Sequence, residues 1–234
     1  TMTSLSTPLS ARPVSPFLRL RAMASIYAEL AKSRLSLLVV ITAVVGYVMA
    51  SPAVIAWPTL WLVAVGVALA AGSANAFNQV WEIDRDRLMP RTADRPLPSG
   101  RIAAGHAIGF AVVTGVLGVA LLALCVNLLA AALTLATILL YVLVYTPLKV
   151  RTTANTVVGA VVGALPPMIG WSAATGGLQT GAWVLGAVLF VWQMPHFLAL
   201  AWMYRADYQL GGFRMLPAAD PSGRLTRGAV VLYS

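Results

Sequence analysis

The chain has 234 residues, of which 59% are hydrophobic and 10% are charged, and its formal net charge is +9. This composition excludes an ordinary soluble domain and indicates an all-α integral membrane protein, because a chain inside lipid must satisfy its backbone hydrogen bonds within helices. The basic balance does not indicate a nucleic-acid partner, since the charges are confined to short clusters beside apolar segments.

The N-terminal region divides into two predicted parts. Residues 1–15 are rich in Ser, Thr and Pro, which predicts a disordered tail. From Phe17 to Leu30 apolar residues recur at helical spacing beside basic ones. That pattern predicts an interfacial helix lying on the membrane surface ahead of the first span.

Three long stretches contain no Asp, Glu, Lys or Arg: residues 35–81, 102–148 and 152–204. A helix crosses the hydrocarbon core in about 20 residues, so each stretch predicts a hairpin of two spans. The expected spans are about 35–56, 58–80, 103–124, 126–146, 154–173 and 182–203. An even number of crossings returns the chain to the side it left, so all charged clusters are expected at one face of the membrane.

The second and fifth spans are rich in small residues, over 68–76 and 159–164, which favours close helix–helix contact. Pro166 and Pro167 fall inside the fifth span. They predict a break or kink there, which a membrane tolerates only where it is buried in protein or lines a cavity.

The positive-inside tendency places the charged face in the cytosol of a bacterial plasma (inner) membrane, which we rank above a mitochondrial inner membrane. Residues 16–227 are expected to form one membrane domain. After Arg227 the sequence turns apolar again, so residues 228–234 are interpreted as the start of a truncated seventh span.

The second span leads into Asn78, Glu82 and Asp86, spaced by four residues. On a continuous helix this spacing keeps the three side chains on one face, about one turn apart. Two carboxylates and an amide oxygen form a hard-oxygen site that suits Mg²⁺. The alternative is a solvated loop in which acidic and basic side chains only pair with one another.

Basic residues follow the acidic ones, among them Arg85, Arg91 and Arg95. Guanidinium groups donate well to phosphate oxygens, and the usual partner of a protein-bound Mg²⁺ is a phosphate. The segment therefore predicts a diphosphate-binding cradle. Lys149 and Arg151, in the loop after the fourth span, would then clamp the leaving group, although the loop alone is also explained by the positive-inside tendency.

The sixth span carries Gln193, Pro195 and His196 in an otherwise apolar run. Polar groups in hydrocarbon tend to face a cavity. Asp207 follows His196 by eleven residues, three turns of a continuous helix, so both are expected to line one cavity at different depths. The alternative for His196 is a helix–helix hydrogen bond.

The chain resembles the intramembrane prenyltransferases of the UbiA superfamily, whose first signature, Asn-x₃-Asp/Glu-x₃-Asp, is matched by Asn78, Glu82 and Asp86. The runs 89–97, 145–149, 163–171 and 192–197 resemble the branch that farnesylates heme. The resemblance extends from about residue 32 to 217. It implies a nine-helix fold, of which this chain would hold six spans and be incomplete.

The resemblance also implies an activity and its participants. A farnesyl group would pass from farnesyl diphosphate to the vinyl group of heme B, with Mg²⁺ held by Asn78, Glu82 and Asp86 and with Asp207 as a second-site ligand. Lys149 and Arg151 would be catalytic. His196 and Gln193 would contact heme. Heme A synthase or cytochrome oxidase assembly factors would be partner proteins.

Three alternatives stay open. Another prenyltransferase of the superfamily would use an aromatic or quinone acceptor. A membrane transporter would bind near the midplane at broken helices, whereas the carboxylates here gather at the rim. A heme-binding membrane subunit without activity would leave the Asn-x₃-Glu-x₃-Asp series unexplained.

Overall fold

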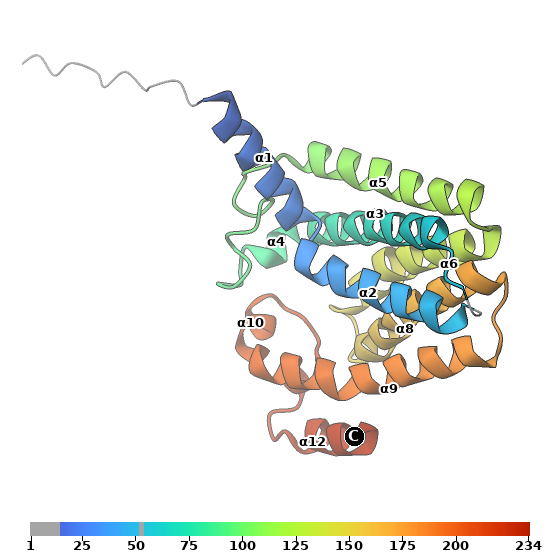
Figure 1. Ribbon diagram of the computed structural model, residues 1–234. Coiled ribbons are helices and arrows are strands. Elements are labelled where there is room, and N and C mark those ends of the chain that lie inside the picture. The colour runs from blue at the N-terminus through green and yellow to red at the C-terminus, as the bar shows by residue number, and fades with distance from the viewer. Residues whose placement is uncertain (1–14, 52–53) are drawn as a thin grey trace, which may run out of the picture.

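The computed structural model describes residues 15–51 and 54–234, and the regular structure of these residues is helical (Figure 1). The elements are α1 (Pro16–Leu30), α2 (Ser33–Ala50), α3 (Trp57–Trp81), α4 (Ile83–Asp86), α5 (Ala104–Cys125), α6 (Leu128–Leu139), the π-helix η1 (Leu140–Tyr145), α7 (Thr146–Leu148), α8 (Asn155–Thr175), α9 (Thr180–Met203), α10 (Arg205–Leu210), α11 (Leu216–Ala219) and α12 (Arg224–Tyr233). The predicted disordered tail lies outside the described residues except for Ser15, whose hydroxyl accepts a hydrogen bond from the Leu18 amide at the start of α1.

Six helical segments are long and apolar enough to cross a membrane: α2, α3, α5, the continuous run from α6 to α7, α8 and α9. Their bounds confirm the six predicted spans and the all-helical membrane fold. The first span is shorter than predicted, because α2 ends at Ala50 rather than near residue 56.

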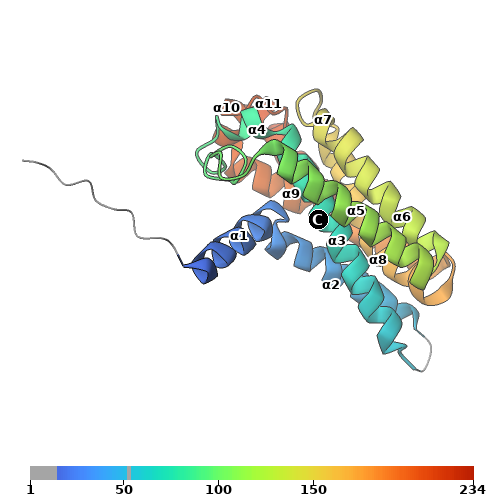
Figure 2. The same ribbon diagram turned by 90° about the horizontal axis from the view of Figure 1, so that it is seen from above.

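The centre of the bundle is formed by α3 and α8. In each of them 61% of the apolar window is buried inside the protein, against 22–28% in the other spans. Helix α3 packs chiefly against α5 and α2, and α8 packs against α2, α9 and α6. Figure 2 shows α3, α5 and α6 running side by side, with α4, α7, α10 and α11 gathered at one end of the bundle.

Helices α2 and α8 touch through glycine. A Cβ atom on Gly170 would collide with the carbonyl oxygen of Ala43, and one on Gly46 would collide with that of Pro167. Of the break or kink predicted in the fifth span, the break is wrong, because α8 continues through Pro166 and Pro167; the kink stays a prediction. Both prolines are buried, as predicted, and the close packing of α2 against them holds the segment on its helical path.

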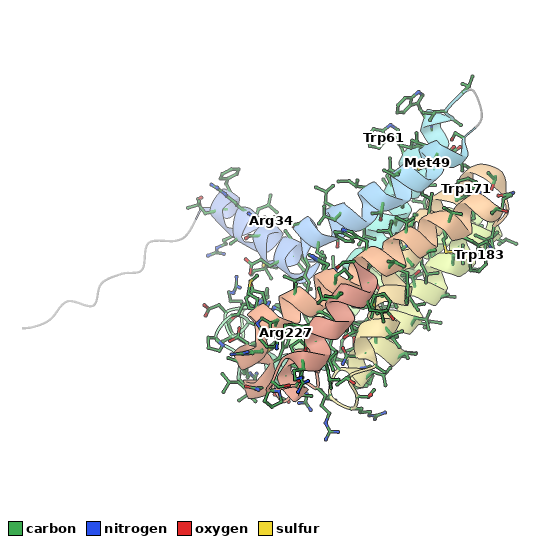
Figure 3. All side chains as sticks on the ribbon, turned by 90° about the horizontal axis from the view of Figure 1, so that it is seen from below. Arg34, Met49, Trp61, Trp171, Trp183 and Arg227 are labelled. Carbon is green, nitrogen blue, oxygen red and sulfur yellow. The ribbon has the colours of Figure 1, made fainter. Side chains whose placement is uncertain are left out.

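The two ends of the bundle differ in character. Figure 3 shows Trp61, Trp171 and Trp183 toward one end, while Arg34 and Arg227 lie toward the other. The gathering of charge at one end agrees with the prediction that the charged clusters share one face, and tryptophan rings at the other end are typical of a membrane interface. Which side of the membrane the charged end faces stays a prediction.

Helices α1 and α12 lie outside the bundle of spans. Helix α1 leaves the bundle at an angle and enters its packing through Leu30, which is fully buried (Figure 1). The predicted helix is therefore confirmed, and its place on the membrane surface stays a prediction. Residues 228–234 continue α12, which packs against α9.

We expect Gly170→Ala to destabilise the bundle by about 1–3 kcal/mol, because the new methyl group meets the α2 backbone and only a shift of the helix can accommodate it. Thermal unfolding in detergent micelles measures the effect. Gly109→Ala in α5 is the matched control, since nothing lies within 4 Å of its Cβ position. Equal melting temperatures for the two variants would contradict the assigned close packing.

Candidate active site

The predicted Asn-x₃-Glu-x₃-Asp series lies at the charged end of α3, and its three side chains are buried: Asn78 and Asp86 are fully inaccessible and Glu82 is 5% exposed. The helix that carries them is not continuous, contrary to the prediction. Helix α3 ends at Trp81, Glu82 has φ −104° and ψ 7°, and α4 begins at Ile83. The amides of Glu82 and Asp86 still bond to the carbonyls four residues earlier, so the series stays on the buried side.

Side-chain amides of α3 hold the turn between α1 and α2. Gln79 donates to the carbonyls of Glu29 and Leu30, at 3.2 and 2.8 Å. Asn75 donates to the carbonyl of Ala31 at 3.2 Å. These contacts fix the backbone immediately before Lys32, which adopts a left-handed conformation with φ 47°.

Lys32 is a site residue that the sequence analysis missed. Its Nζ donates to Oδ1 of Asn78 at 2.9 Å, and the amide of Asn78 donates to Oγ1 of Thr146 at 3.2 Å. Removal from water lowers the pKa of Lys32 to about 7, and the charges of Arg95 and Lys149 act in the same direction. Its place directly before the first span is the one signal in the sequence, and that signal also fits a positive-inside loop.

Glu82 and Lys149 form a buried ion pair with Nζ–Oε1 2.8 Å. Burial alone would raise the pKa of Glu82, but the charges of Lys149 and Lys32 outweigh it and hold that pKa below its usual range. Burial likewise opposes the charge of Lys149, and Glu82 raises the pKa of Lys149 above its usual range. Both groups are therefore ionised at neutral pH.

Asp86 has one paired and one unpaired oxygen. Its Oδ2 accepts from Arg95 at 2.7 Å, while Oδ1 is buried and has no hydrogen-bond partner. A buried carboxylate oxygen without a partner is a group that a cation would satisfy. This oxygen is compatible with a divalent metal ion at the series.

Cations outnumber carboxylates in this cluster. Lys32, Lys149 and Arg95 contact the series, which contributes only Glu82 and Asp86 as acids. Lys149 and Arg95 balance the two acids, and Lys32, whose pKa is about 7, adds positive charge in its protonated form. This arrangement suits a bound anion such as a polyvalent phosphate together with a metal ion.

The π-helix η1 places the end of the fourth span against the series. It runs directly into Thr146, whose hydroxyl donates to the carbonyl of Tyr141 at 2.8 Å. Lys149 follows within one turn and lies 4.8 Å from the centre of the Tyr145 ring. A π-helical turn inserts one residue into the helix, and such turns are frequent at functional sites.

The segment around α10, which carries Asp207, contacts the end of the acidic series and the segment that follows it. Arg85 donates to the carbonyl of Gly211 at 2.9 Å, and Arg91 approaches Asp207 at 3.6 Å and the ring of Tyr204 at 4.6 Å. Within the described residues, no three His, Cys, Asp or Glu side chains form a metal-binding group. Asp207 therefore does not complete a three-carboxylate set with the acids of the series.

A cavity of about 200 Å³ opens beside Glu82. Arg85, Arg151 and Phe213 line it together with Thr146 and other residues of the fourth-span end. Arg151 is exposed and lines this cavity from the same loop that carries Lys149. Of the predicted clamps, Lys149 contacts the acidic series directly and Arg151 faces the adjoining cavity.

The predicted heme contacts lie apart from this cluster. Gln193 is buried between α8 and α9, against Gly163, and donates to the carbonyl of Leu189 at 2.9 Å. His196 is exposed and stacks on Trp192 at 5.0 Å. The expected single helix from His196 to Asp207 is wrong, because α9 ends at Met203 and α10 starts anew after Tyr204.

Residues 39–234 match the profile described as the UbiA prenyltransferase family. A mitochondrial protoheme IX farnesyltransferase of Arabidopsis thaliana is 48% identical over 199 residues, covering 85% of this chain and 46% of the relative. The protoheme IX farnesyltransferase of Solibacter usitatus is 44% identical over 216 residues, covering 88% of this chain and 74% of the relative. The chain thus spans about half the length of the plant relative and about three quarters of the bacterial one.

Solved structures share the fold. A UbiA homolog from Archaeoglobus fulgidus bound to DMAPP and Mg²⁺ superimposes with a TM-score of 0.75 at 15% identity, over 88% of this chain and 73% of that one. A digeranylgeranylglyceryl phosphate synthase gives a TM-score of 0.70 at 20% identity, over 90% and 74% of the two chains.

We expect Lys149→Met to destabilise the protein by about 3–5 kcal/mol, because Glu82 would keep a buried charge without its partner. Adding Glu82→Gln removes that charge and should restore most of the stability. Thermal unfolding in detergent measures both variants.

Arg87→Met is the matched control, because the Arg87–Asp84 pair is exposed to solvent and exposed pairs contribute little. If Lys149→Met and Arg87→Met lowered the melting temperature equally, the buried pair would not have the role assigned to it.

Proposed function

This chain belongs to the UbiA prenyltransferase family, and from that premise we propose that it transfers a farnesyl group from farnesyl diphosphate to the vinyl group of heme B, giving heme O. The observation that carries the proposal is the buried series of Asn78, Glu82 and Asp86, surrounded by cations at one end of a membrane bundle. The names of the relatives in plants and bacteria support heme B as the acceptor.

The same series would hold Mg²⁺ through the oxygens of Asn78, Glu82 and Asp86, and Asp207 is proposed as a ligand of a second metal site on the facing loop. The unpartnered Oδ1 of Asp86 supports this assignment, as does the Mg²⁺ bound to the Archaeoglobus homolog. When bound, the ion would neutralise diphosphate charge as the leaving group departs.

The remaining roles in diphosphate binding are assigned to basic side chains. Lys149 and Arg151 would hold the diphosphate and stabilise the charge that develops on it, because positive groups fixed in a site with little water act strongly on a departing anion. Lys32 would add a third cation next to Asn78. Arg85, Arg91 and Arg95 would keep the surrounding loops in place while offering donors to the phosphate oxygens.

The reaction balances without an external oxidant or reductant. The bond between C1 of the farnesyl chain and the diphosphate oxygen breaks, and both electrons leave with the diphosphate. The vinyl π-electrons of heme B form the new carbon–carbon bond with the allylic cation. Water then adds to the cation on the former vinyl carbon and releases a proton to solvent, which leaves a hydroxyl group.

The apolar bundle gives the reaction its surroundings. The farnesyl chain would lie among the spans, where water is excluded from the first cation. Gln193 and His196 are proposed as heme contacts on α9. We place the protein in a bacterial inner membrane with the charged end in the cytoplasm, and we propose heme A synthase or cytochrome oxidase assembly factors as its partners.

We expect Glu82→Gln and Asp86→Asn each to reduce heme O formation by about two to three orders of magnitude, because each removes a carboxylate that would hold the metal ion. Membranes incubated with heme B, farnesyl diphosphate and Mg²⁺ are assayed by mass spectrometry of the extracted pigments. Chelation of Mg²⁺ should abolish the wild-type product in the same assay.

Asp84→Asn is the control for this pair, since Asp84 lies between the two acids in sequence but is exposed. Heme O formation retained in both site variants would remove the metal assignment. Product formed from an aromatic or quinone acceptor, and not from heme B, would assign the protein to another branch of the family.

A further inference from the structure

We propose that a second cavity, lined by Arg151 and Arg214, binds the carboxylates of the acceptor, so that the heme is held by its propionate edge beside the diphosphate site; this inference rests on the function proposed above. The cavity measures about 610 Å³. Its lining comes from residues 151–153 after α7 and from residues between 209 and 219 around α10 and α11. The metal assignment does not use it, and the diphosphate assignment uses only Arg151, which lines both cavities.

Hydrogen bonds between the two segments build the walls of this cavity. The amide of Arg214 donates to the carbonyl of Lys149 at 2.7 Å. The side chain of Asn155 donates to the carbonyls of Thr152 and Arg214, at 2.6 and 3.0 Å. The site is therefore formed before a ligand arrives, and Arg214 is joined directly to the residue that pairs with Glu82.

The second cavity adjoins the first. Arg151 and Phe213 line both of them, and the first also contains Glu82. A ligand seated in the second cavity would therefore lie next to the diphosphate position, because Arg151 and the buried Phe213 contribute to the lining of both cavities. An acceptor must lie beside the departing group in this way if its vinyl carbon is to reach the allylic cation.

The cavity is positively charged and not neutralised by its surroundings. Among the described residues, neither Arg151 nor Arg214 forms an ion pair, and both are exposed. The acids nearest in sequence are engaged elsewhere: Asp207 faces Arg91, and both oxygens of Asp220 accept hydrogen bonds from Ser222 or Thr226. The guanidinium of Arg214 donates to the carbonyl of Arg151 at 3.4 Å, which leaves its charge without a carboxylate partner. Two guanidinium groups without ion-pair partners in a cavity favour an anionic ligand.

Heme B fits this chemistry. It carries two ionised propionates on one edge and its vinyl groups elsewhere on the ring, so fixing the propionates at the polar end leaves the vinyl groups directed away from it. The hydroxyl groups of Thr152 and Thr153 add donors for a carboxylate. An anionic lipid headgroup is the other source of a similar charge at this end of the bundle.

We expect Arg214→Gln to raise the KM for heme B by about tenfold, because one charge-assisted hydrogen bond is lost, and to leave the KM for farnesyl diphosphate unchanged. Heme B dimethyl ester should show the same loss with the wild-type protein, and the variant should cause no further loss with the ester. Arg224→Gln is the control: it removes an exposed charge after α11 that lies outside the cavity lining.

The assay is run in nanodiscs of phosphatidylcholine, with and without phosphatidylglycerol. A variant effect that appears only with phosphatidylglycerol would assign the cavity to lipid and overturn the proposal. Additive losses from the ester and the variant, or a raised KM for farnesyl diphosphate instead, would also overturn it.

Binding of heme B and of its ester, followed by heme absorbance, separates this inference from the proposed function. If wild-type protein formed no product from heme B, the proposed function would be refuted, but the binding measurement would still test the role of the cavity. About tenfold weaker binding of the ester to the wild type, and of heme B to the Arg214→Gln variant, supports the proposal. Equal binding in all cases overturns it.

Discussion

A carboxylate at the edge of a membrane bundle is the constraint around which this end of the molecule is organised. Glu82 is buried, and an unpaired buried charge costs several kcal/mol, so the fold must deliver a cation to it. That cation, Lys149, comes from the loop that follows the second hairpin. The path of the fourth span and the loop after it are thereby fixed relative to α3, and the cavities beside Glu82 follow from that placement.

The amide side chains of α3 extend the same organisation to the N-terminal side. Asn75 and Gln79 bind backbone carbonyls of the turn between α1 and α2, and Asn78 receives Lys32 from that turn. One face of α3 thus binds the turn between α1 and α2 and also carries the side chains of the proposed metal site.

Sequence patterns were sufficient for the spans and for the acidic series, because charge-free stretches and four-residue spacing are local properties of the chain. They were not sufficient for Lys32, whose role depends on a left-handed turn held by residues more than 40 positions away. The interruptions at Glu82 and Tyr204 were missed for a related reason, since neither is marked by proline or glycine. Arg85 illustrates a further limit: its bond to the Gly211 carbonyl depends on how two distant loops meet.

The π-helix η1 has a consequence for how the chain tolerates length changes. Because its winding accommodates one surplus residue, deleting a single position between Leu140 and Tyr145 would be absorbed by a return to regular winding, whereas deleting one position within the regular α6 would rotate everything beyond it by about 100° about the helix axis. Thr146 would then turn away from Asn78, and the ammonium group of Lys149 would leave its carboxylate. The span would still cross the bilayer, but its last residues would no longer face the acidic series.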